Sequence, residues 1–197
     1  MTSLKIFQKI FCLLFIAGCL TSAWISAKAK GALPAALAGI RLTDHRGRVV
    51  QPASFGKGPM LLNFIFTSCP SACPVQVKEL VAVHRALPAD VKDKVQFLSI
   101  TVDPATDKPA ALASFAKRLG ADVAGWRFAT GQPAEITQLL KRLQVMNPQK
   151  ENPQPSDHRL TLYLFNAEGI PVVTYNGAPV DKQRLVEEIT QLTRLAP

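Results

Sequence analysis

The stretch "MLLNFIFTSCPSACPVQVKEL", Met60 to Leu80, places two cysteines between an apolar run and a segment of helical apolar spacing. The run Met60 to Phe66 predicts a central strand buried on both faces, since strands covered on both sides are apolar throughout. This strand leads directly to Cys69 and Cys73, each of which is followed by a proline. Proline disfavours the α region for the residue before it, so we expect both cysteines to be non-helical and Pro74 to begin a helix.

The rest of the chain continues this alternation of strands and helices. A hairpin that turns at Arg46 and Gly47 is predicted before the first core strand, and an antiparallel hairpin before the last helix. The order strand, helix, strand, helix, hairpin, helix indicates an α/β protein with a thioredoxin-like fold and an added N-terminal β-hairpin. That fold keeps its chemistry where the first core strand meets the first helix. The other predicted strands are 95–103, 126–129, 159–166 and 169–177, and the predicted helices are 75–87, 107–120, 133–143 and 181–195. We expect helix 107–120 to be capped by Asp107 at its start and by Gly120 at its end.

Length and composition favour a single globular domain with a full hydrophobic core, because 48% of the 197 residues are hydrophobic and 19% are charged. The formal net charge is +9, and residues 1–29 contribute three lysines and no acid, so the remaining 20 basic and 14 acidic side chains give +6. These charges are dispersed, without a run of Lys and Arg interleaved with aromatic residues. We therefore expect no nucleic-acid partner.

The first 29 residues have the pattern of a targeting segment. Lys5 and Lys9 precede a charge-free apolar run, Ile10 to Ala27, as in a signal peptide or a membrane anchor. The run has 18 residues, close to the ~20 that span a bilayer. The triplet "AKA" at 27–29 offers a cleavage site, and "IAGC" resembles a bacterial lipoprotein signal that would make Cys19 a lipid attachment point. Three fates stay open: a retained anchor, a cleaved signal and a lipoprotein.

The sequence thus predicts three parts: a signal peptide or membrane anchor over 1–29, a linker over 30–39 and the thioredoxin-like domain over 40–197. Because the segment directs the chain out of the cytoplasm, we expect the domain on the periplasmic side of the bacterial inner membrane, tethered there or released to the periplasm.

Cys69 and Cys73 are the only thiols of the predicted domain, because Cys12 and Cys19 lie in the targeting segment. Three uses are open to them: a structural disulfide, a dithiol that exchanges electrons with other disulfides, and a pair of soft ligands for a metal ion. A structural disulfide would close a very short loop, which stabilises least. A helix N-terminus favours the thiolate that exchange and metal binding both require.

His158 is a further candidate, because it lies where the polar, proline-rich segment 147–156 meets a predicted strand. From the residues alone, a lone histidine is more often a surface residue or a hydrogen-bonded core residue. We expect His45, in a turn, and His84, in a helix, to be structural.

Three segments match the motifs of one known family. "FTSCPSACPVQVKEL", Phe66 to Leu80, is similar to T-x-C-P-x-x-C-P, "SITVDPATDKPAAL", Ser99 to Leu112, to S-V-D-P-x-x-D-T-P-x-x-L, and "DHRLTLYLFNAEG", Asp157 to Gly169, to D-H-S-x-x-x-Y-L-x-D-x-x-G. From about Leu42 onward the chain therefore resembles the Sco/SenC family, copper-binding proteins that assist assembly of the dinuclear copper centre of cytochrome c oxidase. A C-x-x-x-C pair with an Asp-His 85 residues past the second cysteine is far more specific than either part alone.

The resemblance implies that Cys69, Cys73 and His158 bind copper, as Cu(I), Cu(II) or both. Two thiolates and one imidazole suit a three-coordinate Cu(I) ion, or Cu(II) with a weak further ligand, whereas a structural zinc site would need a fourth protein ligand. The implied partners are the copper-binding subunit of cytochrome c oxidase, and other periplasmic copper carriers or thioredoxin-like reductases. We expect Asp157 to orient a ligand and Asp103 to cap the next helix.

The chain departs from the family pattern at three places. Ser71 stands where many members carry an acid, which removes a negative charge that would help to hold Cu(II). Thr101 begins the T-V-D-P block, and Arg159 stands where serine is usual. These departures bear on the oxidation state of the metal and on the client oxidase, and leave the three ligands in place.

Two functions from different classes follow. The first is a copper chaperone, a binding protein and not an enzyme in the turnover sense. The alternative is a thiol-disulfide oxidoreductase that keeps the oxidase copper-site cysteines reduced, with Cys69 and Cys73 as a redox-active disulfide and His158 dispensable. Thioredoxin-type reductases instead carry C-x-x-C and a cis-proline before the strand that faces the pair. A peroxiredoxin-like peroxidase would need Thr67 one residue further from Cys69.

Overall fold

The computed structural model describes residues 34–51, 55 and 58–196. The predicted targeting segment, with Cys12 and Cys19, lies outside the described residues, so its fate and the boundaries at 29 and 39 stay predictions. In the part of the chain that is described, no helix has the length and apolar character needed to cross a bilayer.

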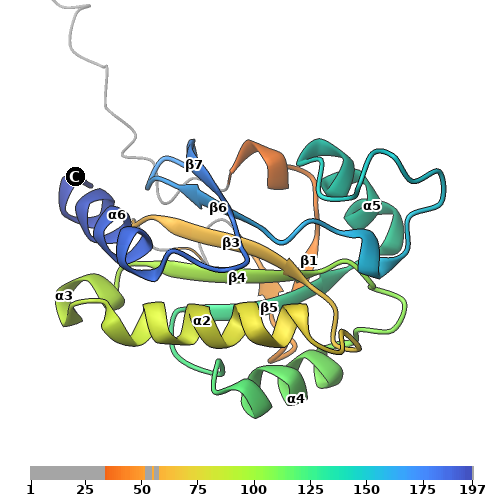
Figure 1. Ribbon diagram of the computed structural model, residues 1–197, viewed down its shortest axis with the longest axis horizontal. Helices are drawn as coiled ribbons and strands as arrows, with labels where there is room; N and C mark the ends of the chain where they lie inside the picture. The colour runs from red at the N-terminus through yellow and green to blue at the C-terminus, as the bar shows by residue number, and fades with distance from the viewer. Residues whose placement is uncertain (1–33, 52–54, 56–57, 197) are drawn as a thin grey trace, which may run out of the picture.

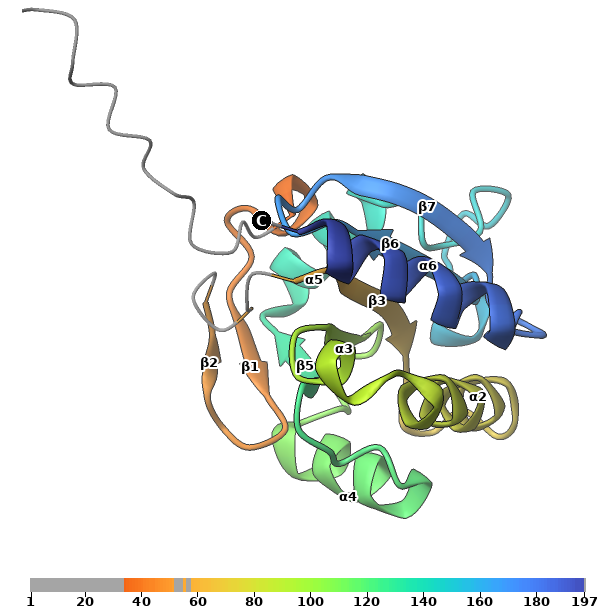
Figure 2. The ribbon, with the colours of Figure 1, turned by 90° about the vertical axis from the view of Figure 1, so that its left-hand side faces the viewer.

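A seven-stranded sheet in the order β2-β1-β5-β4-β3-β6-β7 forms the centre of the molecule, with β2 and β7 at opposite edges (Figures 1 and 2). The three central strands β3, β4 and β5 are parallel, and the hairpins on either side of them are antiparallel. The strands are β1 (Leu42–Asp44), β2 (Val49–Val50), β3 (Met60–Ile65), β4 (Gln96–Thr101), β5 (Trp126–Gly131), β6 (Thr161–Phe165) and β7 (Pro171–Asn176).

Helices cover both faces of the sheet. In Figure 1, α2 and α4 lie below the sheet and α5 lies above it, while α6 packs along α2 and α3 (Figure 2). The helices are α2 (Ala72–Ala86), α3 (Ala89–Lys92), α4 (Pro109–Leu119), α5 (Pro133–Arg142) and α6 (Lys182–Leu195), with short 3-10 turns η1 (Ala35–Leu37) and η3 (Pro155–Asp157).

The predicted order of elements and the N-terminal hairpin are confirmed. Every residue of β3 and β4 is buried, as expected for parallel strands covered on both faces. Two helix ends also follow the sequence: Gly120 takes the left-handed conformation at φ 71° that ends α4, and the side chain of Asp181 caps α6 by accepting a hydrogen bond from the N–H of Arg184.

The prediction that both cysteines are non-helical is wrong for Cys73. Ser71 is the N-cap of α2, so Cys73 is the second helical residue and Pro74 the third. The N–H groups of the first helical turn have no partner within the helix, and proline at the third position therefore costs no hydrogen bond. The first hydrogen bond of the helix runs from the N–H of Val75 to the carbonyl of Ser71.

The end of the predicted linker packs onto the domain. Leu37 in η1 is fully buried in the core, and the guanidinium group of Arg142 donates hydrogen bonds to the carbonyls of Ala36 and Ala38.

Candidate metal-binding site

The predicted site residues meet at the carboxyl ends of the parallel strands, at the right-hand end of the sheet in Figure 1. Cys69 lies in the loop after β3, Cys73 lies in the first turn of α2, and His158 leads into β6. The Sγ atom of Cys73 is 3.9 Å from Nε2 of His158, and the N–H of Cys73 donates a hydrogen bond of 3.3 Å to Sγ of Cys69. Residues 85 positions apart in the sequence are therefore neighbours in the fold.

The two cysteines are free thiols in different environments. Partial burial raises the pKa of the Cys69 thiol, but hydrogen bonds from the backbone N–H groups of Cys73, Ser71 and Ala72 outweigh it, so its pKa lies below the usual value. Cys73 is 0% exposed, and burial raises its pKa to about 12, helped by the neighbouring Cys69 sulfur. At neutral pH, Cys69 is the more nucleophilic thiol and Cys73 holds its proton.

His158 presents its Nε2 lone pair to Cys73. Nδ1 lies 2.7 Å from the carbonyl oxygen of Pro155, which can only accept a hydrogen bond, so Nδ1 carries the ring proton. The ring packs edge-on against Phe66, with centroids 5.7 Å apart. Burial lowers the pKa of His158, despite the opposing hydrogen bond to Pro155. The imidazole is therefore neutral at pH 7, in the tautomer that a metal at Nε2 requires.

Asp107 fixes the loop that carries Cys69. Its carboxylate is 0% exposed and accepts hydrogen bonds from the N–H of Thr67 at 3.0 Å, the hydroxyl of Thr67 at 2.5 Å and the hydroxyl of Thr101 at 2.5 Å. Thr67 lies two residues before Cys69, so a buried charge-assisted network anchors the cysteine loop to the end of β4.

Two predictions about the acids near α4, that Asp107 and Asp103 cap helices, are wrong. Asp107 does not cap the helix, because it points inward to Thr67, and Lys108 is the N-cap without a side-chain hydrogen bond. Asp103 does not cap α4 either, because the helix begins only at Pro109; its carboxylate accepts a long hydrogen bond of 3.4 Å from the N–H of Thr106 and closes a turn.

Gln76 connects α2 to the strands that follow His158. Its side chain is 1% exposed, and its amide NH₂ donates to the carbonyls of Leu160 and Gly177, both at 3.0 Å. Its amide oxygen accepts a hydrogen bond of 3.0 Å from Asn63 in β3. A Cβ atom at Gly177 would overlap the Gln76 amide and the Leu160 carbonyl, so this connection requires glycine there.

Sequence reasoning missed both Asp107 and Gln76 as positioning residues. Gln76 did carry a signal: it is a polar residue on the buried face of α2, three residues after Cys73 and four before Leu80. A long polar side chain in such a stripe has to find buried partners.

The other polar candidates have separate roles. Asp157 accepts a hydrogen bond of 2.8 Å from the N–H of Gln154 and so closes the turn whose Pro155 carbonyl orients His158. His45 is buried, and its ring bridges Asp122 and the N–H of Phe128. A third histidine packs against core aromatic rings of β4 and β5, namely His84 against Phe97 and Trp126.

As the side chains stand, no three His, Cys, Asp or Glu side chains within the described ranges are grouped closely enough to hold a metal ion. The structure therefore brings the predicted donors into pairwise contact, Cys69 with Cys73 and Cys73 with His158, without a closed three-ligand cage. The donor set itself, two soft sulfurs and one imidazole nitrogen, fits a thiophilic ion such as Cu(I).

A family model described as SCO1/SenC matches residues 35–194. The chain belongs to the SCO1/SenC family. The mitochondrial SCO2 homolog of Bos taurus is 34% identical over 155 residues, which cover 78% of this chain and 56% of that protein. The chain thus spans little more than half of the length of this relative.

Solved Sco structures have the same fold. BsSco, described as a member of the Sco family of cytochrome c oxidase assembly proteins with a disulfide switch, is 26% identical, with a TM-score of 0.65 over 79% of this chain and 91% of that chain. Yeast Sco1 is 25% identical, with a TM-score of 0.63 over 79% and 95% of the two chains, and it has also been solved with copper bound. The family resemblance and the thioredoxin-like fold predicted from the sequence are both confirmed.

Proposed function

We propose that this SCO1/SenC protein binds copper through Cys69, Cys73 and His158 and delivers it to the dinuclear copper centre of cytochrome c oxidase. The observation that supports this most directly is the contact of 3.9 Å between Sγ of Cys73 and Nε2 of His158, whose Nδ1 keeps the ring proton and donates it to the carbonyl of Pro155. A histidine oriented in this way, with its free nitrogen beside one thiol and that thiol beside a second, offers the donor types that a soft metal ion prefers. Copper is the cargo here.

The two thiols contribute differently to binding. Cys69 is close to its thiolate form and partly exposed, so an arriving ion meets it first. Cys73, with a pKa of about 12, becomes a thiolate only as the ion displaces its proton. Copper binding therefore releases protons, and acid promotes release of the cargo.

A second function uses the same pair of thiols. A dithiol reductant needs one accessible thiol of lowered pKa and a second thiol close by. Cys69 is partly exposed and has the lowered pKa, and the neighbouring Cys73 is buried and has the raised pKa. The Cys69 thiolate would attack a client disulfide to form a mixed disulfide. Cys73 would then displace the client as a dithiol, which leaves this chain oxidised with a Cys69–Cys73 disulfide. BsSco is described with a disulfide switch.

The chain would act on the outer face of the inner membrane, in the periplasm of a bacterium. Residues 1–29 would tether it there as an anchor or through a lipid on Cys19, or would be cleaved off. Its partners would be the copper-binding subunit of the oxidase, periplasmic copper carriers and thioredoxin-like reductases.

His158→Ala separates the two functions. It removes one of three ligands, so we expect copper affinity to fall by orders of magnitude and oxidase activity to be lost in copper-limited cells. Thiol exchange should keep nearly its normal rate, because attack depends on the Cys69 thiolate. The measurements are copper competition against a chelator, oxidase activity of the strain and disulfide-reduction rates of the purified protein.

His84→Gln is the matched control, since it changes a buried histidine in the core of the domain, away from the cysteines. A His158→Ala strain with normal oxidase activity under copper limitation would contradict copper delivery and leave the reductase function.

A further inference from the structure

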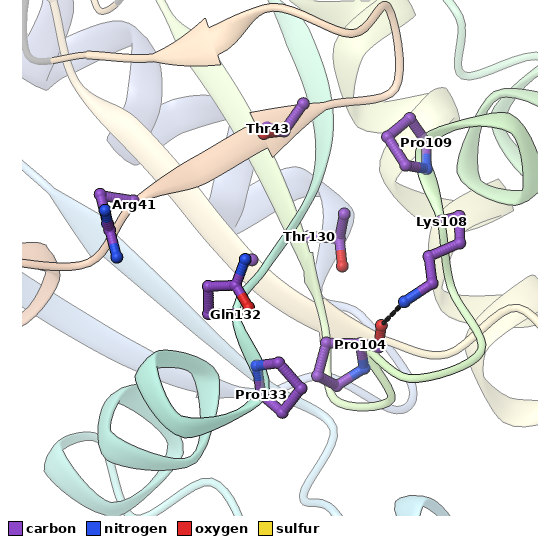
Figure 3. A pocket seen from close by; sticks show the side chains of 9 residues that line it. Arg41, Thr43, Pro104, Lys108, Pro109, Thr130, Gln132 and Pro133 are labelled. Atoms are coloured by element: carbon purple, nitrogen blue, oxygen red, sulfur yellow. Dashed lines mark hydrogen bonds between the residues drawn. The ribbon is translucent and has the colours of Figure 1, made fainter.

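A polar pocket lies beside the loop between β4 and α4, which supplies Pro104 and Lys108 to its lining. It has a volume of about 390 Å³ and lies between the start of β1, the end of β5 and the first residues of α4 and α5 (Figure 3). We call it the Lys108 pocket; Arg41, Lys108, Thr130 and Gln132 line it together with three prolines. Like the cysteine site, it lies at the carboxyl ends of parallel strands, where open α/β sheets commonly bind ligands.

A buried hydroxyl group in this pocket lacks a partner. Thr130 is 7% exposed, and its Oγ1 atom is shielded from water and makes no hydrogen bond within the described part of the chain. Figure 3 shows this oxygen turned toward the middle of the ring of labelled side chains, between Lys108 and Gln132. Buried polar atoms are nearly always satisfied, so an unpaired one beside a pocket indicates a missing partner.

The surroundings of this hydroxyl are positively charged. Lys108 reaches the carbonyl oxygen of Pro104 at 2.9 Å, and among the described residues no carboxylate forms an ion pair with it. Arg41 is neutralised by an ion pair of 2.8 Å with Glu135. The neighbouring acid Asp107 is turned inward, toward Thr67. One cation of the pocket therefore has no counter-charge.

Two helices also begin at the pocket. Lys108 is the N-cap of α4, which has 11 residues and no acid in its first turn. Gln132 is the N-cap of α5, which has 10 residues and one acid in its first turn, Glu135, paired with Arg41. Neither helix has a side-chain cap. The first N–H groups of a helix lack partners within it and carry positive partial charge. A lysine at such an end is repelled by the helix dipole, and an anion would relieve this repulsion.

We infer that the Lys108 pocket binds a small oxyanion, either a phosphate ion or a carboxylate group. Lys108 Nζ would leave the Pro104 carbonyl and pair with the anion, and the Thr130 hydroxyl would donate to it. The first residues of the two helices, Pro109 and Pro133, have no N–H, so α4 and α5 would contribute only the positive partial charge of their N-terminal ends. This site is separate from the copper ligands, and its occupancy does not depend on the proposed function.

The test uses the full chain, purified in detergent, reduced and free of copper. Thermal melting is followed with increasing phosphate, or with increasing acetate, against chloride at equal ionic strength. We expect a saturable rise of the melting temperature with at least one of the two anions, since a ligand that binds only the folded state stabilises it. The anion that gives the rise identifies the source of the oxyanion group.

Variants identify the site. Lys108→Gln should weaken the apparent affinity by about tenfold or more, since it removes a charge-assisted hydrogen bond. The matched control Lys117→Gln changes an exposed lysine in the last turn of the same helix and should bind like the unmodified chain. Thr130→Val should melt no lower without anion, since it deletes an unsatisfied hydroxyl, yet bind the anion at least about threefold more weakly.

Three outcomes would overturn the inference. One is a melting temperature that shows no saturable rise with either anion. Another is an equal rise in Lys108→Gln and Lys117→Gln, which would reveal a general salt effect. The third is unchanged affinity in Thr130→Val, because the buried hydroxyl would then have no part in binding.

Discussion

Cys69 and Cys73 belong to a segment held by buried hydrogen bonds, whereas His158 follows a segment, residues 147–156, that contains no buried residue. The cysteine side is anchored through Asp107, whose partners lie up to 40 residues away. The hydrogen bonds of 147–156 run within the segment or to the two residues that follow it, Asp157 and His158.

This difference suits a protein that must both hold and release a metal ion. An exposed segment with local hydrogen bonds opens at a lower free energy than a buried one. If His158 moves away from the metal ion while Cys69 and Cys73 stay in place, the number of protein ligands falls from three to two without unfolding of the domain. The predictions below test whether the two sides are independent in this way, from the largest expected effect to the smallest.

Loss of either sulfur should have the largest effect. We expect Cys69→Ser and Cys73→Ser each to weaken copper binding by more than about a thousandfold, since a hydroxyl is a poor ligand for a soft ion. Cys69→Ser should leave the metal-free fold nearly as stable as before, and Cys73→Ser should cost about 1–3 kcal/mol because it buries a hydroxyl group. Chelator competition measures the affinity, and denaturant unfolding of the reduced protein measures the stability.

The exposed Ser71→Ala, between the two cysteines, is the control for these variants. A loss of about 2–5 kcal/mol in Cys69→Ser, as on removal of a native disulfide, would instead make the cysteine pair a structural cross-link.

Alkylation should distinguish the two thiols. The pKa of Cys73 is about 12 and that of Cys69 lies below the usual 9.0, so at pH 7 the thiolate fraction of Cys69 is higher by at least about a thousandfold. The midpoint of the rise in the Cys69 rate should lie below pH 9, whereas the Cys73 rate should still rise well beyond it. Mass spectrometry of the reduced protein after timed iodoacetamide treatment gives both rates, and equal rates would contradict the difference between the thiols.

Local pattern predicted most of the fold: the apolar runs of β3 and β4 predicted buried parallel strands. His158 was a candidate ligand only through the resemblance to the Sco/SenC family, and the fold brings its Nε2 atom to 3.9 Å from Sγ of Cys73. The helical position of Cys73 was missed because the steric effect of proline on the preceding residue is a preference and not a prohibition, and Pro74 lies in the first helical turn, where its missing N–H costs no hydrogen bond.

Long-range hydrogen bonds could not be predicted from the sequence. Asp107 has the sequence position of a helix cap, and only the fold places the backbone of Thr67 within its reach, 40 residues away. Gln76 finds its acceptors 84 and 101 residues further along the chain. The unpaired hydroxyl of Thr130 likewise follows from the packing around it and not from any local motif.

Removal of the carboxylate that anchors the cysteine side should cost stability. Asp107→Ala leaves two hydroxyl groups and one N–H, from Thr67 and Thr101, without their acceptor. We expect a loss of about 3 kcal/mol and a changed alkylation rate at Cys69, because its loop is no longer fixed. Asp103→Ala, in the same loop, removes one long hydrogen bond and should cost less than about 1 kcal/mol. Equal losses in the two variants would mean that Asp107 is not the anchor.

The smallest effect should come from Gln76→Met, which tests the histidine side. Methionine has a similar length and removes the polar group of Gln76 together with its hydrogen bonds. The Gly177 carbonyl and the Asn63 amide lose their partner, whereas the Leu160 carbonyl keeps the hydrogen bond from the N–H of Gly177. The net cost should be about 2 kcal/mol, with Gln191→Met on the exposed face of α6 as control.

The same variant also decides whether the two sides move independently. Leu160 follows His158 by two residues. Loss of the hydrogen bond from Gln76 in α2 to the Leu160 carbonyl should therefore make the position of His158 more variable and lower copper affinity by about tenfold. The Asp107 network stays intact in this variant, and the alkylation rate of Cys69 should therefore not change. If Gln76→Met instead alters alkylation of Cys69 while copper affinity stays the same, then Gln76 supports the cysteine side, and the anchored and exposed sides are not separate units.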